Sequence, residues 1–160
     1  MFDKALKLQS TFYEIMRRVK EAGFSISKVK EQALTREMAA HFYKDHEGKP
    51  FYEELVNFMT QGPSVIMVLS KENAVEEWRK LMGPTNPEDA KKTSPKSIRA
   101  QFAHDILSNA VHGSSNIEHA ERSIQFFCSY KCEANGAPGL TGQLHMCASL
   151  VGLLWAIKVY

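Results

Sequence analysis

The sequence feature that most constrains the fold is a short uninterrupted apolar run, Val65-Ile66-Met67-Val68-Leu69, which follows a Gly62-Pro63 turn. Helices of globular proteins commonly contain ten or more residues, whereas strands commonly contain four to eight. Five consecutive apolar residues with no polar alternation are typical of a strand that is buried on both faces. The run therefore predicts a strand in the interior of the domain.

Apolar residues at helical spacing surround this strand along the chain. The spacing and the capping residues predict six helices, over residues 11–22, 35–44, 51–59, 73–82, 97–102 and 117–127. We expect their caps at Thr11, Thr35, Asn73, Ser97 and either Ser115 or Asn116. Alternation over residues 24–30 predicts a second strand, and the Gly, Pro and Asn residues of 83–95 predict a loop. The irregular order of these elements predicts an α+β fold, with helices on one face of a mostly antiparallel sheet.

Length and charge limit the classes of function. A chain of 160 residues with 44% apolar residues is expected to form one domain, and its net charge of +2 argues against a nucleic-acid partner. Three cysteines are too few for a disulfide framework, and residues 1–4 do not begin a signal peptide, so we expect a cytoplasmic protein. The apolar residues 146–160 are too few to span a bilayer and include Lys158, so a membrane role is not expected. A packed strand, a packed helix and a disordered apolar tail remain open for this segment.

The segment Asn109-Ala110-Val111-His112-Gly113-Ser114 is the strongest candidate for chemistry. A neutral imidazole is abundant near pH 7 and is nucleophilic. Gly113 lacks a Cβ, so another molecule can approach the ring and the backbone, and the Ser114 hydroxyl can donate a hydrogen bond. A histidine beside a glycine is more often part of a turn or a core, so this alternative stands beside the catalytic interpretation.

Several donors elsewhere in the chain could cooperate with His112. Arg79, Arg99, the Thr85 hydroxyl and the Asn109 amide together suit a polyphosphate. Tyr43 and Phe51 flank the turn at residues 48–50, and one of them could stack on a flat base. A nucleophilic histidine among arginines fits phosphoryl transfer, because fixed donors neutralise the charge on the transferred group. The alternatives are a solvated helix charge for Arg79 and a core role for Phe51, and sequence spacing alone does not bring these residues together.

Several blocks of this sequence resemble the nucleoside diphosphate kinase family. They are N-x-x-H-G-S, the preceding S-I-R-A-Q-F and L-M-G-P-T-N-P, and H-F-Y-K-D-H-E-G-K-P-F-Y followed by F-M-T-Q-G-P. The match extends from about Ser10 to Phe127. The residues of the L-M-G-P-T-N-P and S-I-R-A-Q-F blocks look most like those of divergent family members of cilia and sperm flagella, some of which carry a thioredoxin domain. We therefore expect a kinase-like domain over residues 1–128, followed by an atypical apolar tail over residues 129–160.

The resemblance implies a ferredoxin-like α+β fold and a ping-pong transfer of the γ-phosphate from a nucleoside triphosphate to a diphosphate. It implies a phosphohistidine intermediate, Mg²⁺ bound to the nucleotide phosphates, and no metal site made by the protein alone. By matching position, it implies the following roles: His112 as nucleophile; Arg79, Thr85, Arg99 and Asn109 on phosphates and sugar; Phe51 on the base; and Tyr43, Gly113 and Ser114 beside the histidine. Implied partners are nucleoside di- and triphosphates, further copies of the chain, and ciliary or cytoskeletal proteins.

Three departures from the family favour weak or absent activity, and one of them is the atypical tail after Cys128. The family begins with a strand that is central in the sheet and ends in a phosphate-binding lysine; here Asp3 stands at the lysine position and the strand is missing. We therefore expect a sheet that is incomplete at its first strand, and we hypothesise that the apolar tail partly covers it. Ser123 stands where an acidic residue orients the histidine ring, and Ser115 stands where aspartate is frequent. A non-catalytic nucleotide-binding or assembly module of a ciliary complex is thus the second interpretation.

Overall fold

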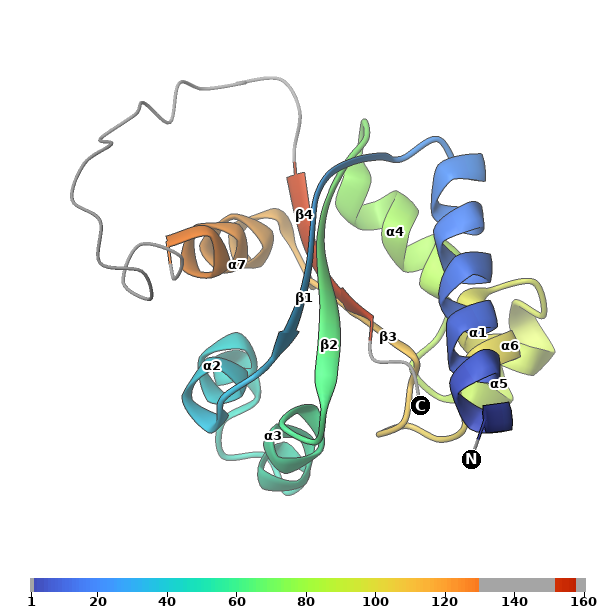
Figure 1. Cartoon of the computed structure of the whole chain (residues 1–160). Helices are drawn as coiled ribbons and strands as arrows, with labels where there is room; N and C mark the ends of the chain where they lie inside the picture. The colour runs from blue at the N-terminus through green and yellow to red at the C-terminus, as the bar shows by residue number, and fades with distance from the viewer. Residues whose placement is uncertain (1, 130–151, 158–160) are drawn as a thin grey trace.

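The computed structural model describes residues 2–129 and 152–157, which form helices packed around a four-stranded antiparallel sheet (Figure 1). The described elements are α1 (Phe2–Glu21), β1 (Ser25–Ala33), α2 (Arg36–Phe42), the 3-10 helix η1 (Lys44–His46), α3 (Tyr52–Met59), β2 (Pro63–Ser70), α4 (Ala74–Met82), α5 (Pro87–Thr93), α6 (Ile98–Phe102), β3 (Val111–Gly113), α7 (Ile117–Ser129) and β4 (Gly152–Ile157). The α+β class is as predicted. Among the described residues, no helix is both long enough and apolar enough to cross a membrane.

Strand β2 lies inside the sheet, and its side chains enter two separate cores. Met67 and Leu69 are fully buried in the core that includes Trp78 of α4. Ile66, which points to the opposite face, belongs to the core that includes Met38 of α2. The predicted double-sided burial of this strand is confirmed. Helices lie on both sides of the sheet in Figure 1, so the expectation of helices on one face was wrong; a strand that is apolar on both faces needs a cover on each.

Strand β4 occupies a central position in the sheet, whose strand order is β1-β2-β4-β3. It pairs antiparallel with residues 65–70 of β2 and with residues 111–113 of β3. The N-terminal segment supplies no strand: residues 2–21, including Asp3, form helix α1. The expected gap in the sheet is therefore filled from the other end of the sequence. We had expected the apolar tail to lie over the sheet as a partial cover. In the structure, residues 152–157 of this tail instead form one of the strands of the sheet.

Helix ends follow the local capping chemistry in most cases. Thr35 Oγ1 accepts a hydrogen bond from Met38 N at 3.2 Å, Ser97 Oγ accepts from Ala100 N at 3.3 Å, and Asn116 Oδ1 accepts from His119 N at 2.8 Å. These caps are as predicted. One other cap was wrong, and one was right in position but not in its hydrogen bond. Thr11 lies inside α1, because residues 2–10 contain no proline or glycine and continue the helix. Asn73 precedes α4 in a left-handed conformation, with φ of 52°, and its side chain makes no capping bond.

Helix α5 replaces much of the loop predicted over residues 83–95. Asn86 Oδ1 accepts from Glu88 N at 3.0 Å, and Pro87 occupies the first turn, where its missing N–H is not needed. Acidic residues then fill the first turn and lysines the last, which complements the helix dipole. Turn-forming residues here mark the start of a helix rather than a continuous loop.

Candidate functional site

His112 lies at the middle of β3, and its side chain is 9% exposed. Its ring lies edge-on to that of Tyr43, with centroids 5.9 Å apart and an interplanar angle of 78°. Ala110, two residues earlier, has φ of +57°, a conformation that costs a residue with a Cβ roughly 1–2 kcal/mol. Strain of this kind persists only where the surrounding structure fixes it, and it often accompanies functional sites. No feature of the sequence identified Ala110.

Most of the predicted site residues line one cavity of about 560 Å³. They are Tyr43, Phe51, Arg79, Thr85, Arg99, Asn109, His112 and Gly113. Segments far apart in the sequence thus meet around the imidazole: the start of α3, the end of α4, the following loop, α6 and β3. Ser114 does not line the cavity. It is fully buried, and its Oγ has no hydrogen-bond partner among the described residues.

Arg99 is a buried cation without a carboxylate partner among the described residues. Its guanidinium donates to Gly83 O at 3.2 Å, to Thr85 Oγ1 at 3.4 Å and to Val111 O at 3.1 Å, while its Nε has no partner among the described residues. Burial, with a smaller contribution from the charge of Arg79, lowers the pKa of Arg99 to about 10. The group stays charged at pH 7. A buried cation that lies near a second arginine would be stabilised by an anion.

Asn109 connects the histidine segment to the loop after α4. Its Nδ2 donates to Thr85 O at 2.7 Å and to Ile106 O at 3.2 Å, and its Oδ1 has no partner among the described residues. Both amide hydrogens are therefore used within the protein. What remains is one buried acceptor, which suits a hydroxyl group of a sugar rather than a phosphate oxygen.

The mouth of the cavity carries a cation and an aromatic ring. Arg79 is exposed, and its guanidinium makes no hydrogen bond or ion pair with another described residue. Phe51 is 47% exposed at the start of α3, and its ring centroid is 5.8 Å from that of His46. Lys49 Nζ lies 2.9 Å from His46 Nδ1, and burial together with the Lys49 charge lowers the pKa of His46. An exposed ring beside a neutral imidazole offers a flat apolar surface for a base.

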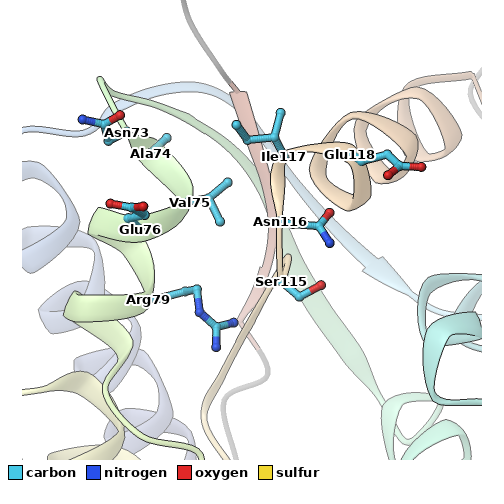
Figure 2. Close-up of a pocket in the computed structure, with 9 residues that line it drawn as sticks. All are labelled: Asn73, Ala74, Val75, Glu76, Arg79, Ser115, Asn116, Ile117 and Glu118. Carbon is cyan, nitrogen blue, oxygen red and sulfur yellow. The ribbon is translucent and has the colours of Figure 1, made fainter.

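A second cavity of about 620 Å³ lies between the start of α4 and residues 115–118 (Figure 2). It shares Arg79 and Ser115 with the first cavity. In Figure 2 the Arg79 side chain extends from α4 towards the Ser115–Asn116 segment. Of the predicted site residues, only Arg79 lines this second cavity, so the chemistry is placed in the first.

His119 and Glu54 are site features that sequence reasoning missed. Ser115 N donates to His119 Nδ1 at 3.4 Å, and His119 Nε2 lies 3.2 Å from Phe42 O. The second contact requires a proton on Nε2, so both are satisfied by the neutral ring, which connects the cavity wall to α2. Glu54 is the one carboxylate among the described residues that line the first cavity. Ser123, where an acidic residue was expected from the resemblance, is buried on α7.

The donor set of the first cavity fits Mg²⁺ that arrives with a nucleotide. Arginine, amide and hydroxyl groups predominate, and a single carboxylate cannot form a protein cage for the ion. No cluster of three or more His, Cys, Asp or Glu side chains that could hold a metal occurs in the part of the chain that the structure describes. Phosphate oxygens and water would supply the ligands, with Glu54 as the available protein carboxylate.

Comparisons with known proteins identify the family and the fold of the chain. The profile of the family described as nucleoside diphosphate kinase matches residues 6–131. The chain belongs to the nucleoside diphosphate kinase family. A crystal structure of the nucleoside diphosphate kinase of Aquifex aeolicus is similar, with a TM-score of 0.72 and 40% identity, covering 78% of this chain and 87% of that one. The enzyme of Encephalitozoon cuniculi is similar with a TM-score of 0.70 and 31% identity, over 74% of this chain and 79% of that one. These neighbours confirm the expected ferredoxin-like fold.

The curated relatives differ in how much of their own length the chain covers. Thioredoxin domain-containing protein 6 of Xenopus laevis is 59% identical over 113 residues, which is 71% of this chain and 18% of that protein. Thioredoxin domain-containing protein 3 of Homo sapiens is 50% identical over 111 residues, which is 69% of this chain and 19% of that protein. The chain thus spans less than a fifth of these relatives. A probable nucleoside diphosphate kinase 5 of Arabidopsis thaliana is 47% identical over 114 residues, 71% of this chain and 79% of that protein.

Proposed function

We propose that this chain transfers the γ-phosphate of a nucleoside triphosphate to a nucleoside diphosphate through a phosphohistidine at His112. The observation that carries the proposal is the cavity shared by the His112 ring and Arg99, a buried guanidinium without a carboxylate partner among the described residues. A fixed cation beside a nucleophile stabilises charge on the transferred group without reorganisation during the reaction. The single exposed carboxylate of the cavity, Glu54, does not neutralise it.

In the proposed reaction, an imidazole nitrogen of His112 attacks the γ-phosphorus, the bond from that phosphorus to the bridging oxygen breaks, and the diphosphate leaves with the electron pair. A second diphosphate then attacks the phosphohistidine in the reverse sense. Arg99 and Arg79 hold phosphate oxygens, and the Thr85 hydroxyl donates to a third position. Mg²⁺, carried by the nucleotide, neutralises charge on the phosphates. Phe51 stacks on the base, and Asn109 Oδ1 accepts a sugar hydroxyl.

The supporting residues position the nucleophile. Tyr43 lies edge-on to the imidazole, Gly113 leaves room for the phosphate, and buried Ser114 directly follows β3, where we assign it a supporting role beside the histidine. The second candidate function is a non-catalytic nucleotide-binding or assembly module. The observation that favours it is Ser123, which is neutral where the resemblance implies a carboxylate that orients the histidine ring.

Incubation with γ-labelled ATP and Mg²⁺ tests the catalytic proposal. Label on the protein that is labile in acid, stable in base and absent in His112→Ala supports it. His104→Ala is the matched control, because His104 is exposed and lies outside the described lining of both cavities. Absence of label in the unsubstituted chain, together with nucleotide binding that survives His112→Ala, would favour the non-catalytic module instead.

The location of the protein in the cell and its partners are also proposals. Because its sequence blocks resemble those of divergent family members of cilia and sperm flagella, we propose a cytoplasmic protein that is assembled in cilia or flagella, as a homo-oligomer or with cytoskeletal partners. Imaging of a tagged chain in ciliated cells tests the location. An even cytoplasmic distribution without enrichment in the axoneme would contradict the ciliary assignment.

A further inference from the structure

The strand that carries His112 is short and depends on β4. β3 contains three residues, and in the described part of the chain it pairs with β4 alone. His112 is registered opposite Ala156, Val111 opposite Ile157, and Gly113 opposite Trp155. The backbone position of the candidate nucleophile is thus set by a segment more than forty residues later in the sequence.

The same segment completes the ladder of the central strand β2. Residues 65–70 pair with residues 152–157 along the whole length of β4. Met67 and Leu69 are fully buried, so the backbone around them is enclosed by the two cores. Without β4, amide and carbonyl groups of β2 and β3 would lose their partners inside the protein, at about 1–3 kcal/mol for each group that stays buried.

A long connection separates β4 from the rest of the fold. Residues 130–151 lie between α7 and β4 in the sequence. A segment of this length can extend roughly 70 Å, so β4 can leave and re-enter the sheet without unfolding α7. The entropic cost of joining two elements through a connecting segment rises only slowly with its length, so the number of intervening residues opposes insertion weakly. The insertion must therefore be stabilised mainly by the two ladders and by the packing of the strand.

We propose that residues 152–157 form a separable insert strand, and that residues 2–129 present a slot between β2 and β3 that binds this apolar segment. Occupancy of the slot fixes β3 and assembles the cavity around His112. The occupant is the C-terminal segment of this chain, recognised through backbone hydrogen bonds along both of its edges. The proposal that occupancy of the slot controls His112 rests on the proposed phosphoryl transfer. The proposal that the slot binds residues 152–157 does not depend on that transfer.

Amide hydrogen exchange on the unmodified chain tests the slot directly. We expect the amides of residues 111–113 and 152–157 to be protected by about 100-fold or more relative to a free peptide, and to open together, since one segment closes both ladders. Amides in the β1–β2 ladder should exchange more slowly than this group. Unprotected amides in residues 152–157, or a β3 that stays protected while they exchange, would overturn the proposal.

Capture of a peptide provides the second test. Ala156→Pro removes an N–H from a central strand and should expel β4. The full-length variant should then bind a fluorescent peptide of residues 146–160 at least about tenfold more tightly than the unsubstituted chain, whose own strand competes. Ala137→Pro, the same substitution outside residues 152–157, should behave like the unsubstituted chain, and a peptide that carries proline at position 156 should not bind.

Equal capture by all three chains, or capture of the proline-containing peptide, would contradict the proposal. If Ala156→Pro fails to fold, exchange in the unmodified chain remains decisive. Labelling by γ-labelled ATP distinguishes binding of the strand in the slot from control of phosphorylation at His112. Loss of label in Ala156→Pro and its return with the peptide support control of His112. Peptide capture without label in any chain would overturn the proposed transfer and leave the slot established.

Discussion

Gly83 connects the stability of the fold to the candidate site, and Gly83→Ala tests this connection. Gly83 ends α4 with φ of 84° and ψ of 180°, a conformation used almost only by glycine. A Cβ at this position would lie 2.3 Å from Ser97 Oγ and 2.6 Å from Ser97 Cβ. Ser97 caps α6, which carries Arg99, and Gly83 O accepts a hydrogen bond from Arg99. The substitution should therefore disturb both the helix and the guanidinium.

The magnitude follows from two contributions. The backbone conformation costs a residue with a Cβ about 1–3 kcal/mol, and relief of the overlap with Ser97 adds about 1–3 kcal/mol. Gly48→Ala is the matched control: its φ of +81° is similar, but no atom lies within 4 Å of the added Cβ. The free energy of unfolding should thus fall by about 2 kcal/mol more in Gly83→Ala than in Gly48→Ala. For a chain of this size the difference corresponds to roughly 4–8 °C in Tm.

Denaturant unfolding monitored by circular dichroism measures both variants. ATP affinity, measured on the folded fraction, should fall in Gly83→Ala and stay unchanged in Gly48→Ala. Equal losses of unfolding free energy in the two variants, within about 0.5 kcal/mol, would refute the packing argument. An undisturbed ATP affinity in Gly83→Ala would refute the connection to Arg99.

Two further predictions concern charged groups. Arg99→Lys should weaken ATP binding about tenfold or more in titration, since lysine cannot reproduce the planar donors to Gly83 O and Val111 O; unchanged affinity would contradict this. Hydrogen bonds from Lys80 and Lys71 lower the pKa of Glu77 to about 2, so its contribution to stability is present above pH 4.5 and lost as the pH falls towards 2. Unfolding curves of Glu77→Gln and the unsubstituted chain should converge near pH 2, and a constant difference would count against the assignment.

The elements that sequence reasoning predicted are those set by local chemistry. The run at residues 65–69 required burial on both faces, and Thr35, Ser97 and Asn116 each satisfy a nearby backbone donor. Helix α5 was missed because Asn86 and Pro87 are turn formers in one context and helix starters in another. The left-handed Ala110 was missed because only contacts distant in sequence impose such a conformation.

The position of β4 shows the limit of local patterns. An apolar stretch at residues 146–160 is compatible with a strand, a helix or a tail, and the choice depends on the vacancy between β2 and β3. Residues 2–21 form a helix and supply no strand at this position, and the pairing partner does not follow from either segment alone. Residue chemistry suggested the site residues and the resemblance gave them roles, and the structure brings eight of the predicted residues to one cavity. The restricted hydrogen bonding of Asn109 was visible only in the structure.

Mass spectrometry of the phosphorylated chain tests the central claim most directly. The protein is incubated with ATP and Mg²⁺, digested at neutral or basic pH, and its peptides are sequenced. A single phosphoryl group on the imidazole of His112, removed when a nucleoside diphosphate is added, is the predicted result. A phosphoryl group on another side chain, or none on His112 in a chain that binds ATP, would contradict the account.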